Sequence, residues 1–269
     1  NNRKMFCPRG KMLGGSSSHN GMVHVRGNAK DFDNWAQLGL TNWNYEKVLP
    51  YFKKSESIEG LDKEYRNNSG PLKLSRSPNG NILTQVYLDA AQQAGYQINN
   101  DMNGKNQEGF GLMDTTIYKG RRQSTSVTYL HPIIHRSNLK VLTNVTVNKI
   151  IFENKRATGV ECNINGKSNK FYSNQEILLS AGAINSPHLL MLSGIGPENQ
   201  LKKHGIEPVE CLEGVGENLQ DHLETYVQYE CKKPVTLYSA QNPIRMALIG
   251  IEWFLFKSGI AANSNLETG

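Results

Sequence analysis

Cysteine is scarce in this chain of 269 residues, with four residues at positions 7, 162, 211 and 231. None of them forms a CxxC pair, so the sequence predicts no structural zinc site, and we expect no metal centre. The wide spacing also excludes a small disulfide-stapled fold, although it leaves one disulfide open if the protein is secreted.

The sequence also lacks a concentrated patch of charge. The net charge is +6, and the Lys and Arg residues are scattered, with no basic stripe that contains interleaved aromatic residues. We therefore expect no nucleic-acid partner. With 38% hydrophobic and 20% charged residues, the chain has the composition of a soluble globular protein.

Long hydrophobic runs are absent. The longest, Met246 to Phe256, is interrupted by Gly250 and Glu252, so it predicts a buried helix and no membrane span. Two N-x-[ST] sequons, at Asn67 and Asn144, favour a secreted, extracellular protein, with the first in a predicted surface loop.

Local patterns predict a mixed set of helices and strands. A loop and a helix start are expected over residues 10–27, and a surface loop over residues 60–80. Further helices are expected from Asp31 to Trp35, from Tyr45 to Lys54 after a cap at Asn42 or Asn44, and from Asn79 to Gln93. The expected strands are 113–118, 139–142, 145–152, 157–164 and 170–173.

Residues 9–22, RGKMLGGSSSHNGM, form the first motif that indicates chemistry. Glycines let a backbone approach a flat or phosphorylated ligand closely, and the serines and Asn20 add hydrogen-bond donors. A flexible Gly/Ser linker is the alternative interpretation. The tight flanking by Leu13 and by Met22-Val23 is unusual for a linker.

The second motif, residues 182–196, reads GAINSPHLLMLSGIG and follows the apolar run Glu176 to Ala181. This order predicts a buried parallel strand that leads into a helix over Pro187 to Ser193, with Ser186 as its cap. Such a unit places ligands at the carboxyl edge of a sheet, although an ordinary βα unit without a ligand would have the same pattern.

These two segments resemble the two signature motifs of the glucose-methanol-choline (GMC) oxidoreductases, and the similarity extends over essentially the whole chain. The first motif matches at Gly10, Leu13, Gly14, Gly15, Ser16, Ser17 and Asn20, and it departs from the family at His19 and His24. The family usually has an aliphatic residue at the first of these positions and an aromatic residue at the second. The sequence is most similar in character to insect members.

The resemblance implies an FAD cofactor and a set of residues that contact it. Gly14, Gly15, Ser16 and Ser17 would approach the pyrophosphate-ribityl part, and the ring would be lined by Asn20, Gly21, Met22 and Val23. Val147 would hold the adenine through its backbone, although a plain strand valine is the alternative. Ala181, Gly182 and Ser186 would pack near the phosphates, and Asp221-His222 would have a structural role.

The resemblance leads to a specific hypothesis for His19, which is covalent attachment of the flavin. A few members of the family have a histidine at this position that is bonded covalently to the flavin 8α-methyl group. The alternative is a histidine that only hydrogen-bonds in a polar loop. His24 has the plainer interpretation of an aromatic replacement.

The resemblance also implies which parts of the chemistry are not found here. In the family a histidine base takes the hydroxyl proton of an alcohol, and hydride passes to flavin N5. That base and the GxGxxG motif have no match in this sequence, and we expect them beyond Gly269 and before Asn1. No catalytic residue is therefore assigned, and His131, His135, His188 and His204 are expected at the surface or in loops.

Taken together, these features predict the α/β fold class. We expect an incomplete Rossmann-like FAD-binding domain over residues 1–40 and 120–225, and an α+β substrate domain with an antiparallel sheet over residues 41–119 and 226–269. The expected function is oxidation of the CH–OH group of a small alcohol, sugar or sterol-type substrate, with oxygen or a quinone as electron acceptor. A GMC-like homologue without redox activity, with a structural or binding role, is the alternative. As an isolated piece the chain is expected to be inactive and to be unstable or aggregate, because a sheet face would be uncovered.

Overall fold

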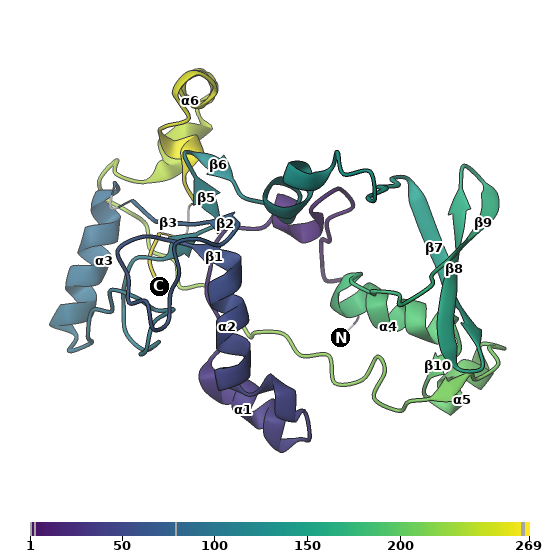
Figure 1. Ribbon diagram of the computed structural model, residues 1–269. Coiled ribbons are helices and arrows are strands. Elements are labelled where there is room, and N and C mark those ends of the chain that lie inside the picture. Colours follow the sequence, from purple (N-terminus) through teal and green to yellow (C-terminus); the bar gives the residue numbers. More distant parts are fainter. Residues whose placement is uncertain (1, 3, 79, 265–266) are drawn as a thin grey trace. The chain divides into compact units, whose positions relative to one another are not determined.

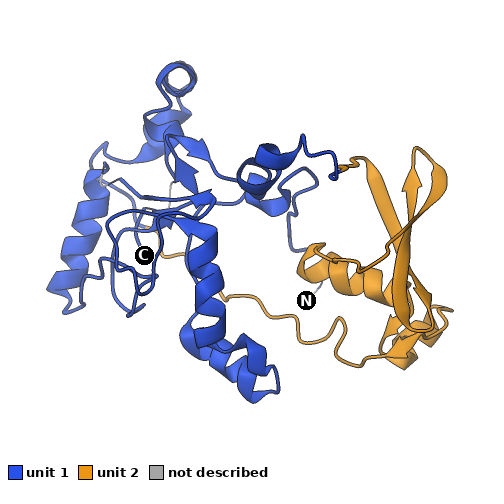
Figure 2. Ribbon diagram, viewed as in Figure 1, with its two compact units in different colours: residues 1–139, 229–269 blue, residues 140–228 orange. Residues whose placement is uncertain are grey.

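The computed structural model describes residues 2, 4–78, 80–264 and 267–269, which divide into two compact units. Unit 1 contains residues 1–139 and 229–269, and unit 2 contains residues 140–228 (Figure 2). The predicted FAD-binding domain would draw on both units, and its boundaries remain a prediction.

Unit 1 is built from helices around several two-stranded pairings (Figure 1). Its helices are α1 (Ala29–Gln37), α2 (Tyr45–Ser55), α3 (Ile82–Gln93) and α6 (Pro243–Phe256). Its strands are β1 (Glu56–Ser57), β2 (Leu72–Lys73), β3 (Ser75–Arg76), β4 (Asp114–Thr115), β5 (Ile117–Tyr118) and β6 (Arg121–Arg122). Shorter helical turns lie at Gly15–Ser18, Thr41–Trp43, Ser126–Leu130, His131–Ile133, Leu237–Gln241 and Ile260–Ala262.

The helix starts follow from side-chain caps. Asn44, one of the two expected caps, accepts a hydrogen bond from Lys47 N at 3.2 Å and begins α2. Asn28 caps α1, which starts two residues before the expected Asp31. Asn81 caps α3, whose expected first residue, at position 79, lies outside the described residues.

Unit 2 has an antiparallel sheet with the strand order β7-β8-β9. The strands are β7 (Val145–Glu153), β8 (Arg156–Ile164) and β9 (Lys167–Tyr172), as the β-branched pattern predicts. The remaining elements are α4 (Gly182–Leu192), β10 (Ile195–Gly196), α5 (Glu198–Lys203) and β11 (Glu210–Cys211). Ile150 and Cys162 are buried in this sheet, at 7% and 1% exposure. The expected α/β class, with an antiparallel sheet, is confirmed.

Several local predictions are wrong. Residues 176–181 are irregular, with Leu178 81% exposed, because no described segment pairs with them as a parallel strand requires. Helix α4 accordingly begins at Gly182 rather than Pro187, and Ser186 lies inside it instead of capping it. Residues 139–142 form no strand. The helix start expected at Met22-Val23 is also wrong, because this stretch is extended beside β4 and α1 begins only at Ala29.

The burial of α6 and of the loop of residues 60–80 also differs from what the sequence predicts. Helix α6 forms over the apolar run, but most of its side chains are exposed, with Ile244 at 74% and Phe254 at 71%. The predicted surface loop of residues 60–80 contains Arg66, which is 2% exposed. Among the described residues, no helix is long and apolar enough to cross a bilayer.

Candidate functional site

The glycine-rich motif forms a tight turn whose backbone favours glycine at positions 10, 14 and 15. Gly14 and Gly15 have φ angles of 88° and 54°, which side chains disfavour. A Cβ on Gly10 would lie 2.3 Å from the carbonyl carbon of Gly15, so the two backbones are in contact. A Cβ at Gly15 itself would meet nothing within 4 Å, and this face of the backbone is therefore open to a ligand.

The serine hydroxyls of the motif hydrogen-bond to main-chain atoms of the turn itself and of Thr125. Ser17 Oγ donates to Gly14 O at 2.5 Å and accepts from Thr125 N at 2.9 Å. Ser18 Oγ donates to Leu13 O at 2.8 Å. Ser16 Oγ accepts from the N–H of Gly10 at 3.2 Å. Because these hydroxyls are used in bonds that stabilise the turn, the open backbone at Gly15 is the part that can face a ligand.

Arg122, at the end of β6, holds the second half of the motif. Its Nη1 donates to Ser17 O at 3.2 Å, to Asn20 O at 2.8 Å and to Asn20 Oδ1 at 2.7 Å. Burial lowers the pKa of this guanidinium. Sequence reasoning missed Arg122, because two adjacent arginines in a short polar stretch form no pattern that would single out one of them.

The chain from Gly21 to His24 runs beside β4 and is held mainly by its backbone. Val23 pairs with Thr115, and the N–H of Thr116 donates to Met22 O at 2.7 Å. The N–H of His24 donates to Asp114 O at 2.8 Å. Ser264 Oγ donates to Gly21 O at 2.8 Å. His19, by contrast, is exposed at the end of the turn, where its ring is accessible.

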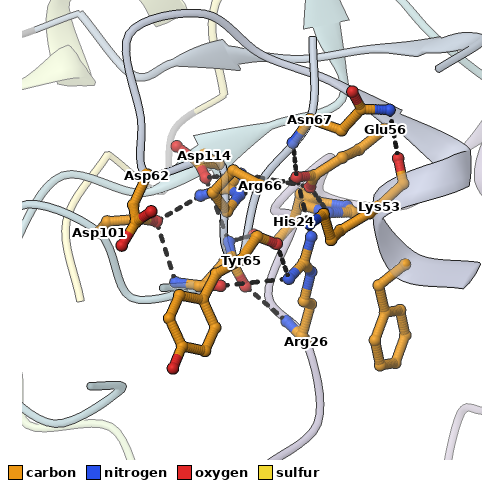
Figure 3. Close-up of polar contacts among 12 residues, drawn as sticks. His24, Arg26, Lys53, Glu56, Asp62, Tyr65, Arg66, Asn67, Asp101 and Asp114 are labelled. Atoms are coloured by element: carbon orange, nitrogen blue, oxygen red, sulfur yellow. Dashed lines mark hydrogen bonds and ion pairs between the residues drawn. The ribbon is translucent and has the colours of Figure 1, made fainter. Parts of the chain in front are cut away.

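A largely buried ionic cluster supports this segment, and Figure 3 labels all of its members except Arg76. We use the name ionic cluster for three arginines and three carboxylates, which are Arg26, Arg66, Arg76, Glu56, Asp101 and Asp114. Arg66 is central, since its Nε lies 2.9 Å from Glu56 Oε1, its Nη2 lies 2.8 Å from Asp114 Oδ2, and its Nη1 contacts Asp101. Opposite charges in equal number make it tolerable to bury these groups.

Glu56 is the most buried acid of the cluster, at 0% exposure. Burial alone would raise its pKa, but His24, Arg66 and Arg26 more than offset this and lower the pKa from 4.5 to about 2. His24 Nε2 lies 3.6 Å from Glu56 Oε2, which is too long for a hydrogen bond. His24 therefore contacts an ionised carboxylate, which a plain aromatic replacement would not predict.

The remaining predicted site residues lie in unit 2. Val147 is in β7, paired with Cys162 and 39% exposed, next to a break in the strand register. Gly182 has a φ of 90°, and Ser186 Oγ accepts from Ala181 N at 3.0 Å. Asp221 and His222 are exposed in irregular chain. The structure thus brings together the residues from Gly14 to Val23, and the adenine role of Val147 remains a prediction.

The histidines that were expected not to be catalytic are at the surface. His131, His135, His188 and His204 are all exposed. His131 Nε2 lies 3.2 Å from Ser126 Oγ, a short-range contact. This confirms that they are surface residues.

Known proteins resemble this chain along its whole length. Human mitochondrial choline dehydrogenase is 50% identical over 268 residues, covering 99% of this chain and 45% of that protein. The oxygen-dependent choline dehydrogenase of Brucella ovis is 48% identical over 266 residues, covering 99% and 48% respectively. The chain therefore spans about half the length of these curated relatives. The expected similarity to insect members finds no support in these matches.

Solved structures give the same result for the fold. An FAD-dependent oxidoreductase from Chaetomium thermophilum superposes with a TM-score of 0.88 at 28% identity, over 100% of this chain and 50% of that one. Formate oxidase of Aspergillus oryzae, from a study of FAD modification, superposes with a TM-score of 0.85 at 25% identity, over 97% and 47%.

The family match covers residues 1–224 and is described as GMC oxidoreductase. Both motifs, with the glycine turn that the structure shows to be sterically required, lie inside this range. The chain belongs to the GMC oxidoreductase family.

Proposed function

We propose that this chain forms part of an FAD-dependent dehydrogenase or oxidase that oxidises the CH–OH group of a small alcohol. Family membership supports the oxidoreductase class, and the expected cofactor is consistent with the solved relatives, whose names refer to FAD. FAD would accept a hydride from the alcohol carbon. Oxygen or a quinone would be the final electron acceptor, and the Brucella relatives are named oxygen-dependent.

The observation that carries the proposal is the open face of the glycine turn. Gly14 and Gly15 adopt positive φ angles, and nothing lies within 4 Å of the Cβ position at Gly15. A phosphate or ribityl group can therefore approach the backbone there without displacing a side chain. Ser16 and Ser17 would keep the turn in this shape, and Asn20, Gly21, Met22 and Val23 would continue along the ring.

Choline is the first substrate to test, because both groups of curated relatives are named choline dehydrogenases. These names favour a small alcohol over the sugar and sterol-type substrates that the family resemblance also admits. A homologue without redox activity is the competing function. It would keep the fold and the ionic cluster and bind no flavin.

The test is a visible absorbance spectrum of the full-length gene product, recorded before and after acid precipitation. We expect flavin bands before precipitation. Bands that remain with the pellet, and are lost in His19→Ala, would establish covalent attachment at His19. Bands that leave with the supernatant would make His19 an ordinary contact. A folded protein without flavin would refute the oxidoreductase function and favour the homologue without redox activity.

Choline turnover is then measured on the flavin-containing protein, with oxygen and a soluble quinone as separate acceptors. Reduction of the flavin by choline under anaerobic conditions would support the substrate. Flavin that stays oxidised with choline but is reduced by another small alcohol would keep the reaction class and reject choline.

A further inference from the structure

The side-chain amide of Asn103 bonds to the main chain on both sides of Val25. Its Oδ1 accepts from the N–H of Arg26 at 2.7 Å, and its Nδ2 donates to the C=O of His24 at 3.0 Å. The same Nδ2 donates to Asp114 Oδ2 at 3.1 Å, and the residue is 4% exposed. One neutral buried side chain thus joins the chain at 24–26 to the ionic cluster.

This pattern of bonds copies what a neighbouring strand would provide. A strand takes the C=O of one residue and the N–H two residues further on, and a planar amide offers a donor and an acceptor for the same two groups. Val23, just before this point, is bridged to Thr115, and His24 N–H donates to Asp114 O. The amide therefore continues the main-chain anchoring from β4 past the point where strand pairing stops.

Asn103 is itself held in place by its loop. Its N–H donates to Asp101 Oδ1 at 3.2 Å, and Asp101 N–H in turn donates to Asn99 Oδ1 at 2.8 Å. Asp101 also contacts Arg66 of the ionic cluster. The loop is thereby fixed to the same charges that surround Glu56, so the side-chain amide of Asn103 is held in one position.

We propose that Asn103 is a positioning residue for the flavin, acting through the segment Asn20 to Val23. The inference rests on the proposed function, in which that segment lines the flavin ring. Met22 has a φ of 65°, a conformation that a free segment would readily leave. By fixing His24 and Arg26, the amide holds the carboxyl end of the segment, while Arg122 holds the other end at Asn20.

Two substitutions separate the bonds. Asn103→Ala removes all three, whereas Asn103→Asp keeps the acceptor for Arg26 N–H, loses both donations and places a second carboxylate beside Asp114. Asn169→Ala is the control, because the Asn169 amide also donates to a main-chain carbonyl, that of Lys167 at 2.9 Å, but takes no part in the bonds that hold Asn103 or residues 20–26. All three variants are made in the full-length gene product with its flavin.

Hydrogen exchange and visible circular dichroism of the flavin are the measurements. We expect the Arg26 amide to exchange at least about tenfold faster in Asn103→Ala, since a buried hydrogen bond is lost, but to stay protected in Asn103→Asp. Both variants should change the visible circular dichroism of the flavin and lower the flavin-to-protein ratio. Asn169→Ala should leave the flavin circular dichroism and the flavin-to-protein ratio as in the unsubstituted protein.

Each remaining outcome decides the matter. Faster exchange at Arg26 with unchanged flavin circular dichroism would show a merely structural residue and overturn the inference. If Asn103→Ala does not fold, Asn103→Asp decides by the same flavin signals. Absence of flavin from the unsubstituted protein would overturn the proposed function, and this inference with it.

Discussion

The guanidinium of Arg66 meets the carboxylate of Glu56 at 2.9 Å, with both side chains almost completely withdrawn from water. Removing one partner of a buried pair leaves an uncompensated charge, and such changes destabilise by about 3–5 kcal/mol. We expect Arg66→Ala to lower the free energy of unfolding by about this amount. Urea denaturation followed by circular dichroism measures it.

The exposed pair Lys202 and Glu198, at 2.5 Å, provides the control for that prediction. Both side chains are about half exposed or more, so the pair gains little from being formed. Lys202→Ala should leave the denaturation midpoint unchanged. Equal effects of the two substitutions would contradict the role of the ionic cluster.

Glu56 predicts how stability depends on pH. Its pKa is lowered from 4.5 to about 2 in the folded state, so the folded state favours the ionised form. The resulting stability is fully present above pH 4.5 and is lost as the pH falls from about 4.5 to about 2. Glu56→Gln should be less stable at neutral pH and show a flatter decline over this window. Equal slopes for the two proteins would refute this assignment.

The glycine turn should not accept even a methyl group at Gly10. A Cβ there would lie 2.3 Å from the carbonyl carbon of Gly15, so Gly10→Ala must open the turn. We expect the full-length protein to fold with at most a small fraction of its flavin. The flavin-to-protein absorbance ratio measures this. Gly214→Ala, where a Cβ meets nothing within 4 Å, should keep full flavin content.

Arg122 should also contribute to flavin binding, because it holds the motif at Ser17 and Asn20. Its guanidinium donates to Ser17 O and twice to Asn20, so Arg122→Ala removes three hydrogen bonds at once. A charged donor contributes more than a neutral one, and we expect retention of flavin to weaken by about tenfold or more. Arg121→Ala, at the exposed neighbouring position, is the control and should have no effect. Equal flavin retention in both variants would contradict the prediction.

Helix α6 should control the solubility of residues 1–269 produced alone. Ile244 and Leu248 are 74% and 60% exposed, and exposed apolar patches of this kind promote association. Replacing both by Glu should raise the soluble, monomeric fraction in gel filtration. Gln200→Glu adds negative charge at an exposed position in another helix, α5, and should not. If both raise it equally, charge rather than α6 is responsible.

Local signals predicted much of this structure and both of its motifs. Asn44 as a cap, the β-branched content of β7 and β8 and the glycines at 14 and 15 depend on residues close in sequence, so the sequence alone could reveal them. The ionic cluster could not be found in this way. Glu56 and Asp114 reach Arg66 from well-separated positions, and a charged residue in a Gly- and Asn-rich stretch indicates a surface loop. The strand predicted over residues 176–181 is wrong because an apolar run becomes a strand only where a second strand pairs with it.

The bond from Ser264 Oγ to Gly21 O joins positions that are 243 residues apart. During synthesis the amino-terminal part leaves the ribosome first, and contacts this distant in sequence form late. The glycine turn and the ionic cluster can assemble from residues 10–125, but the anchoring of Gly21 has to wait until Ser264 has emerged. The order of translation therefore makes the bond at Gly21 a late product of folding. A prematurely terminated chain would retain the turn, with Asn20 held by Arg122 and Met22 by Thr116, but would lack the bond at Gly21.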